Sequence, residues 1–225
     1  MGTMIELTAS DGFTFDAYHV APTGPRKGGL VLIQEIFGLT AWIKRTCDAY
    51  GALGYEVIAP SLYDRQKRGF VAAAVTPETL AEGVKYATDN GFKKPVLDMQ
   101  ACTDKLKASG PVFAVGYCYG GTAAWIAACE VDGIAAASAY YGGMLANMAH
   151  LTPKCPVIAH FGTKDAHIPQ ANIDRFHAEK PDVPVYMYDA GHGFARDGSD
   201  DYHAPSAKLA LERTLALFQS AGAIA

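Results

Sequence analysis

The segment Gly116-Tyr117-Cys118-Tyr119-Gly120 places the tightest constraint on how this chain can fold. It matches a sharp strand-to-helix turn of the form G-x-nucleophile-x-G, with cysteine where a serine usually stands. Residues 111–115 before it are apolar and rich in strand formers, and residues 121–128 after it suit a buried helix. The glycines let the chain reverse sharply. The segment therefore predicts a strand, a tight turn and a helix, with the Cys118 thiol held clear of the sheet.

Apolar strand-like segments alternate with helix-like segments along the rest of the chain. Strands are expected at residues 29–33, 55–59, 111–115, 134–139, 157–161 and 183–188, and helices at 42–53, 77–90, 96–109, 121–130, 170–179 and 204–220. Residues 5–8 and 13–19, joined by Ser10-Asp11-Gly12, predict a β-hairpin. We therefore expect one α/β domain over residues 1–225, with a mostly parallel, doubly wound sheet and an N-terminal antiparallel hairpin. Residues 63–75 are the least periodic and are expected to form a loop over the sheet edge.

Composition and charge argue against several classes of protein. The net charge of −4 is mild, and the absence of a basic block argues against nucleic-acid binding. No apolar run reaches membrane-spanning length, and the first residues lack the pattern of a signal peptide. The five cysteines include no C-x-x-C pair, and the histidines show no metal-ligand spacing. We expect a cytoplasmic monomer that binds no membrane and needs no metal or cofactor.

Polar residues follow several of the expected strands at their carboxyl ends, where ligands bind in open α/β sheets. Glu35 follows residues 29–33, and Cys118 follows the central strand. Asp165 follows residues 157–161, and His192 follows the last strand. The order of nucleophile, acid and histidine along the chain is that of the α/β-hydrolases. This agreement favours catalysis over a buried, inert cysteine.

Five short segments together resemble the dienelactone hydrolase family of α/β-hydrolases. They are Gln34-Glu35-Ile36-Phe37-Gly38, Gly116-Tyr117-Cys118-Tyr119-Gly120-Gly121, Tyr140-Tyr141-Gly142, residues 162–165 and Gly191-His192-Gly193-Phe194-Ala195-Arg196. The resemblance implies an α/β-hydrolase fold and a catalytic triad of Cys118, His192 and Asp165. It further implies that Glu35 contacts the cysteine in the resting state, and that Arg196 meets a substrate carboxylate.

One departure from the family pattern concerns the substrate. Family members that act on dienelactone have a second carboxylate-binding arginine, with a tyrosine one helical turn later. The corresponding helix here, residues 77–86, contains no arginine. Arg65 and Arg68 are candidate substitutes, but the sequence does not fix their direction. The resemblance therefore predicts the reaction mechanism more firmly than it predicts the substrate.

The chemistry assigns a role to each of these residues. A thiol attacks as thiolate and titrates near 8.5, so His192 is expected to take its proton while Asp165 orients the imidazole. The backbone N–H groups of Ile36 and Tyr119 are expected to form the oxyanion hole. The aromatic residues expected to line the substrate pocket are Phe37, Tyr119, Tyr140, Tyr141 and Phe194.

The leading hypothesis is a hydrolase that opens an enol lactone such as dienelactone (carboxymethylenebutenolide) to maleylacetate, through a thioester on Cys118. A thiolate leaves more readily than an alkoxide, so simple esters should react slowly and amides hardly at all. The first alternative keeps the triad and changes the substrate to another lactone or ester, because the second arginine is missing. The second alternative is a non-catalytic binder of small molecules, or a thiol redox sensor.

Overall fold

One sheet of eight strands runs through the structure, a computed structural model that describes residues 1–224. The order across the sheet is β1-β2-β4-β3-β5-β6-β7-β8. The strands are β1 (Thr3–Thr8), β2 (Thr14–Val20), β3 (Gly28–Ile33), β4 (Tyr55–Pro60), β5 (Val112–Tyr117), β6 (Ile134–Tyr140), β7 (Val157–Gly162) and β8 (Val185–Tyr188). The pairs β1–β2 and β2–β4 are antiparallel and all the others are parallel. The predicted fold class and the N-terminal hairpin are thereby confirmed.

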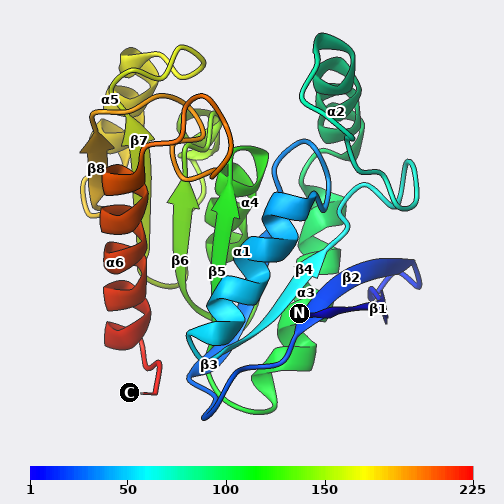
Figure 1. Cartoon of the computed structure of the whole chain (residues 1–225). Coiled ribbons are helices and arrows are strands. Elements are labelled where there is room, and N and C mark those ends of the chain that lie inside the picture. The colour runs from blue at the N-terminus through cyan, green and yellow to red at the C-terminus, as the bar shows by residue number, and fades with distance from the viewer. Residues whose placement is uncertain (225) are drawn as a thin grey trace.

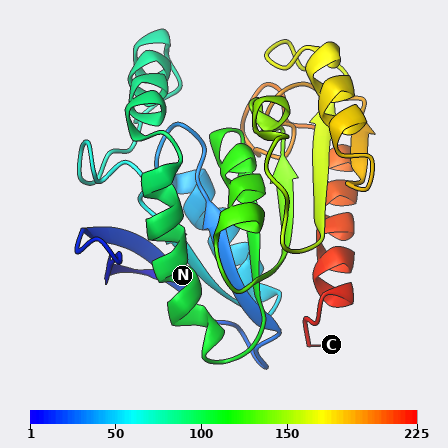
Figure 2. The ribbon, with the colours of Figure 1, turned by 180° about the vertical axis from the view of Figure 1, so that it is seen from behind.

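Helices cover both faces of this sheet. In Figure 1, α1 (Ala41–Ala52) and α6 (Ala204–Ser220) lie in front. Figure 2, seen from behind, shows α3 (Lys93–Lys107), α4 (Tyr119–Glu130) and α5 (Gln170–Glu179) on the opposite face. The helix α2 (Pro77–Asn90) stands beyond the carboxyl ends of the strands, and a short 3-10 helix, η1 (Leu145–Met148), follows β6. The arrangement leaves the carboxyl edge of the sheet for a functional site.

Local signals explain where the helices begin. The Thr40 side chain accepts a hydrogen bond from the N–H of Ile43 and caps α1. Thr76 and Thr79 form a reciprocal capping box at the start of α2. The helix α3 begins at Lys93, three residues before the predicted start, with Pro95 in its first turn. Proline is tolerated there because the first N–H groups of a helix have no acceptor within it.

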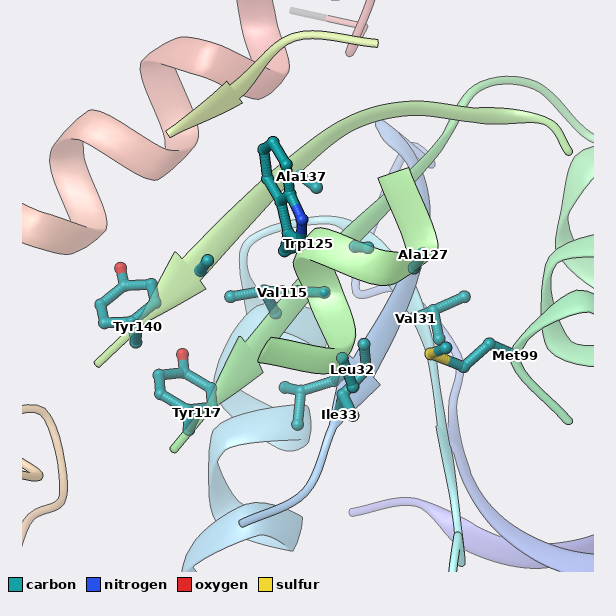
Figure 3. Packing of buried hydrophobic residues seen from close by; sticks show 14 of the residues in the cluster. Val31, Leu32, Ile33, Met99, Val115, Tyr117, Trp125, Ala127, Ala137 and Tyr140 are labelled. Atoms are coloured by element: carbon teal, nitrogen blue, oxygen red, sulfur yellow. The ribbon is translucent and has the colours of Figure 1, made fainter. Parts of the chain in front are cut away.

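The core lies on both sides of the central strands. Every residue of β3 and β5 is buried, as expected of parallel strands covered on both faces. Figure 3 shows Trp125 of α4 packed among residues of β5 and β6. The indole N–H of Trp125 donates to the Met148 carbonyl at 2.9 Å. This packing holds α4, and with it the turn at Cys118, in a fixed position.

The loop of residues 63–75 contains no helix or strand, as predicted, apart from an isolated bridge between Gly38 and Val71. It is packed onto the body rather than free, because Tyr63 and Phe70 are buried. Of the helices within residues 1–224, none has the length and apolar character needed to cross a membrane.

Candidate active site

The turn at Cys118 has the geometry expected of a nucleophile on a strand-to-helix turn. Cys118 has φ 57° and ψ −116°, one of two non-glycine residues with positive φ in the described chain. The flanking glycines permit the close backbone approach that this sharp turn requires. A Cβ on Gly116 would lie 1.8 Å from the Gly120 carbonyl oxygen, and one on Gly120 would lie 2.4 Å from the Ile33 carbonyl oxygen. Only glycine fits both positions.

Asp165 and His192 meet at the same edge of the sheet. His192 Nδ1 lies 2.7 Å from Asp165 Oδ2, and Asp165 Oδ1 accepts from the N–H groups of His167 and Ile168 at 2.8 Å and 3.1 Å. The Asp165 side chain is fully buried. Burial would raise the pKa of this carboxyl, but the hydrogen bonds from His192 and the two N–H groups hold it below its usual value. Asp165 therefore stays ionised and fixes the orientation of the imidazole.

The histidine in turn interacts with the cysteine. Burial tends to lower the pKa of His192, but the hydrogen bond with Asp165 and the proximity of Cys118 outweigh it and raise this pKa to about 10. His192 keeps 19% of its side chain exposed, so a substrate can reach it. The structure thus brings Cys118, His192 and Asp165 together in the arrangement of a catalytic triad, and their catalytic roles remain a prediction.

Glu35 and Arg196 form a second charged pair beside the triad. Glu35 Oε2 lies 3.5 Å from an Arg196 guanidinium nitrogen, and within residues 1–224 this oxygen has no hydrogen-bond partner. Burial raises the pKa of Glu35, and the charges of Arg196 and His192 offset this only in part. The Arg196 guanidinium lies 5.6 Å above the Phe37 ring and is 21% exposed. Arg196 is therefore placed to bind an anion next to a buried carboxyl.

The expected oxyanion-hole donors follow the carboxyl ends of two neighbouring strands, β5 and β3. Tyr119 is the first residue of α4, so its N–H has no acceptor within the helix. Ile36 lies in the loop that follows β3. The helix α2 packs directly on this loop, because a Cβ on Gly83 would lie 2.3 Å from the Ile36 carbonyl oxygen. No sequence pattern indicated that contact.

The aromatic residues divide differently from the prediction. The Tyr140 hydroxyl bonds to Thr214 Oγ1 at 2.8 Å, so its ring faces α6, which corrects its expected place in the substrate pocket. Tyr141, which was also expected at the pocket, has φ 37° and places its ring 5.0 Å from that of His192. Phe194 is fully buried and packs on Tyr141 and Tyr140, a core position rather than an open pocket wall.

Two further tyrosine hydroxyls lie near the nucleophile, and of these only Tyr63 was missed by sequence reasoning. Tyr63 and Tyr141 are fully buried, and neither hydroxyl has a hydrogen-bond partner in the described part of the chain. Burial is the main cause that raises the pKa of each, and the nearby Cys118 adds to it. Tyr63 also packs on Tyr119, at 5.8 Å between ring centroids. Both remain neutral donors beside the site.

Neither candidate for the missing arginine reaches the site. The Arg65 guanidinium, on a side chain 7% exposed, bonds to Asp11 and Asp98 at 2.7 Å each. Arg68 pairs with Asp16 and Glu6 on the surface, at 2.5 Å and 2.8 Å. The loop of residues 63–75 therefore supplies no second arginine beside Arg196.

No group of three or more potential metal-ligating side chains lies together within residues 1–224. His160, one of the histidines set aside in the sequence, is buried and bonds to Ser138 and Tyr188. Burial, with a smaller effect of Arg213, lowers its pKa to about 3, so it is a neutral member of the core.

Comparisons with known proteins agree with this geometry. A family model described as the dienelactone hydrolase family matches residues 15–222. The chain is 31% identical to a carboxymethylenebutenolidase of Pseudomonas putida, over 94% of this chain and 93% of that one. It is 29% identical to carboxymethylenebutenolidase 1 of Cupriavidus pinatubonensis, over 95% and 94%.

Solved structures give the same result. A crystal structure of a putative dienelactone hydrolase from Klebsiella pneumoniae superposes with a TM-score of 0.81 at 26% identity, covering 96% of this chain and 99% of that one. An esterase of Pyrococcus furiosus, at 15% identity and a TM-score of 0.67, shares the fold and covers 95% of this chain and 92% of its own. The chain belongs to the dienelactone hydrolase family, as its sequence motifs predicted.

Proposed function

We propose that the protein hydrolyses an enol lactone, or a similarly activated ester, that carries one carboxylate, through a thioester on Cys118. The observation that supports this most directly is the 2.7 Å contact of Asp165 with His192, an imidazole whose pKa is also raised by the nearby Cys118. A protein that only binds a small molecule, or senses oxidants, has no need of this arrangement. Family membership likewise favours a hydrolase of esters or lactones over those alternatives.

The first half of the reaction forms the thioester. The Cys118 thiol gives its proton to His192, and the sulfur attacks the carbonyl carbon of the lactone. The N–H groups of Ile36 and Tyr119 hold the oxyanion of the tetrahedral adduct. The ring C–O bond then breaks, and the leaving oxygen takes the proton from His192. Throughout, the Asp165 carboxylate stabilises the imidazolium.

The second half releases the product. A water molecule gives a proton to His192 as its oxygen attacks the thioester carbonyl. The C–S bond breaks, the acid leaves, and the proton returns to the Cys118 sulfur. A thiolate leaves a tetrahedral adduct more readily than an alkoxide does, so the first adduct moves forward only when its leaving oxygen is stabilised. An enol oxygen meets this condition, because the released enol tautomerises to a ketone.

The charges around the site support a substrate with one carboxylate. Arg196 is partly exposed and paired with Glu35 at 3.5 Å, while Arg65 and Arg68 are held by acidic residues elsewhere. A bound carboxylate would share the guanidinium with Glu35 and so raise the pKa of Glu35 further, which favours its uptake of a proton.

The test follows the ultraviolet absorbance of dienelactone with wild-type protein, Cys118→Ala and the matched control Cys155→Ala. Wild type and the control should bleach the substrate, and Cys118→Ala should not. Acid quenching during turnover should leave an acyl group on the Cys118 peptide, detected by mass spectrometry. Turnover that persists in Cys118→Ala would refute the thioester. Inactivity of folded wild-type protein on dienelactone, with activity on another enol ester, would retain the mechanism and change the substrate.

A further inference from the structure

A groove of about 380 Å³ lies between α1 and α6, on the face of the sheet turned toward the viewer in Figure 1. Its volume falls in the range of small-molecule sites. Tyr117 and Tyr140 form its floor, and Figure 3 shows them projecting side by side from the ends of β5 and β6. None of the three triad residues lines it. The groove is thus a cavity distinct from the catalytic triad.

The walls of the groove are suited to a flat ring. Trp42 of α1 meets Tyr117 edge to face, with centroids 5.0 Å apart and planes at 78°. Tyr117 in turn lies 4.8 Å from Tyr140. Leu211 of α6 closes the other side with an aliphatic surface. Aromatic edges and faces disposed in this way favour another aromatic ring over an aliphatic one.

One polar group in the groove lacks a partner. Tyr50 is 2% exposed, and its hydroxyl has no hydrogen-bond partner within residues 1–224. Burial and the neighbouring Tyr117, whose hydroxyl approaches that of Tyr50 without the geometry of a hydrogen bond, raise its pKa well above the usual value, so it stays neutral. A buried hydroxyl without a partner destabilises the protein. A ring that carries a hydroxyl of its own would satisfy it.

Of the charged residues that line the groove, two are cations, Arg45 and Lys208, and one is an anion, Asp197. Arg45 is paired with Asp197 at 3.0 Å, so these two charges offset each other. Lys208 is 80% exposed, and its ammonium reaches Glu212 only at 3.9 Å. The lysine therefore remains available at the rim, and an anionic group on the ligand would lie next to it.

We propose that this groove is a second binding site, for a small phenolic carboxylate. The ring lies between the aromatic wall and Leu211, its hydroxyl bonds to Tyr50, and its carboxylate meets Lys208 at the mouth. The site adjoins the catalytic machinery through one loop. Ala195 and Asp197 line the groove, whereas Arg196 between them reaches Glu35 in the active site. A ligand in the groove would therefore contact the segment that positions Arg196.

The test is a calorimetric titration of the whole protein with 4-hydroxybenzoate, without substrate. A dissociation constant on the order of 1 mM is expected for a probe of this size. Ala207→Trp fills the groove from α6 and should weaken binding at least about tenfold. Lys208→Gln should weaken it about twofold to fivefold at low salt, because the lysine is exposed. Lys94→Gln, the same change on the opposite face of the molecule, should have no effect.

Two further probes test the ligand class. Benzoate lacks the hydroxyl that would meet Tyr50, and 4-hydroxybenzyl alcohol lacks the charge that would meet Lys208, so each should bind more weakly than 4-hydroxybenzoate. If either binds as tightly, the phenolic carboxylate is the wrong class. If Ala207→Trp does not fold, Ala49→Trp fills the groove from an exposed position on α1 instead.

Other results would overturn the site itself. Binding that survives the groove-filling variant but is lost in Arg196→Gln would place the probe in the active site. Absence of saturable binding at roughly ten times the expected dissociation constant would show that the groove takes no such ligand. Because no step of the titration involves turnover, the result does not depend on the proposed hydrolysis.

Discussion

Replacement of Asp165 by asparagine tests the link between the acid and the base. The oxygen of the new side-chain amide could still accept from the N–H groups of His167 and Ile168, so the loop should keep its shape. The amide nitrogen, however, would face His192 Nδ1 at the position where Oδ2 now lies, 2.7 Å away. An amide donor there requires Nδ1 to accept. The proton would then sit on Nε2, which could no longer take one from Cys118.

The expected loss follows from the environment of His192. Burial acts to lower its pKa, yet Asp165 and Cys118 together raise it from 6.5 to about 10. A rise of that size corresponds to roughly 5 kcal/mol in favour of the imidazolium. If Asp165 supplies half of this stabilisation of the imidazolium, its replacement costs about 2–3 kcal/mol, or about a hundredfold in rate. The wrong tautomer adds to this, so kcat/KM should fall by about 10²–10⁴.

The assay compares kcat/KM and the rate of Cys118 alkylation by iodoacetamide at neutral pH. Asp104→Asn, a like substitution on the exposed face of α3, serves as control and should leave both unchanged. Alkylation in Asp165→Asn should be slower at least tenfold, because fewer thiols are ionised. If Asp165→Asn stays folded and both rates stay within threefold of wild type, Asp165 does not support the base.

The same substitution should change how stability depends on pH. The pKa of Asp165 is below its usual 3.8 in the folded protein, so its contribution to stability is present above that pH and lost below it. The pKa of His192 is raised, so its contribution is fully present below 6.5 and lost as the pH rises through about 10. Urea unfolding should therefore show the largest destabilisation by Asp165→Asn between about pH 4 and 6.5, and a smaller one at pH 10.

Three other substitutions test the framework and the anion site. Gly116→Ala places a Cβ 1.8 Å from the Gly120 carbonyl oxygen, so urea unfolding should show a loss of more than about 3 kcal/mol; a loss below about 1 kcal/mol would contradict the required close approach. Arg65→Met leaves the buried Asp98 carboxyl without its cation and should cost about 3–5 kcal/mol, with kcat/KM of the folded protein unchanged. Arg196→Gln should raise KM for a carboxylate-bearing ester about tenfold to a hundredfold and leave that for its neutral methyl ester unchanged; equal effects on both would contradict a carboxylate site.

The sequence could predict the fold because its signals are local and repeated. Buried parallel strands form continuous apolar runs, and the polar residues after four of them converge because parallel strands share one carboxyl edge. Asp165 and His192, 27 residues apart, could be paired in this way before any contact was known. The cause is topological, so the details of side-chain packing were not needed.

The direction of single side chains could not be predicted. Side chains alternate between the two faces of a sheet along a strand, but the sequence does not show at which residue the strand ends. At the end of β6, the positive φ of Tyr141 changes the direction of the chain. Tyr141 therefore contacts His192, and Tyr140 bonds to Thr214 on the other side. The partners of Arg65 are likewise distant in sequence, at Asp11 and Asp98.

Unfavourable local features gather around the nucleophile. The two non-glycine residues with positive φ within residues 1–224 are Cys118 and Tyr141, and each such position carries strain. Three of the five buried polar atoms without partners in this part of the chain belong to Glu35, Tyr63 and Tyr141. Such groups destabilise a fold unless something binds to them. Their concentration at one edge of a well-packed sheet is what a preorganised site requires, because donors already in place need not reorganise when charge develops on a substrate.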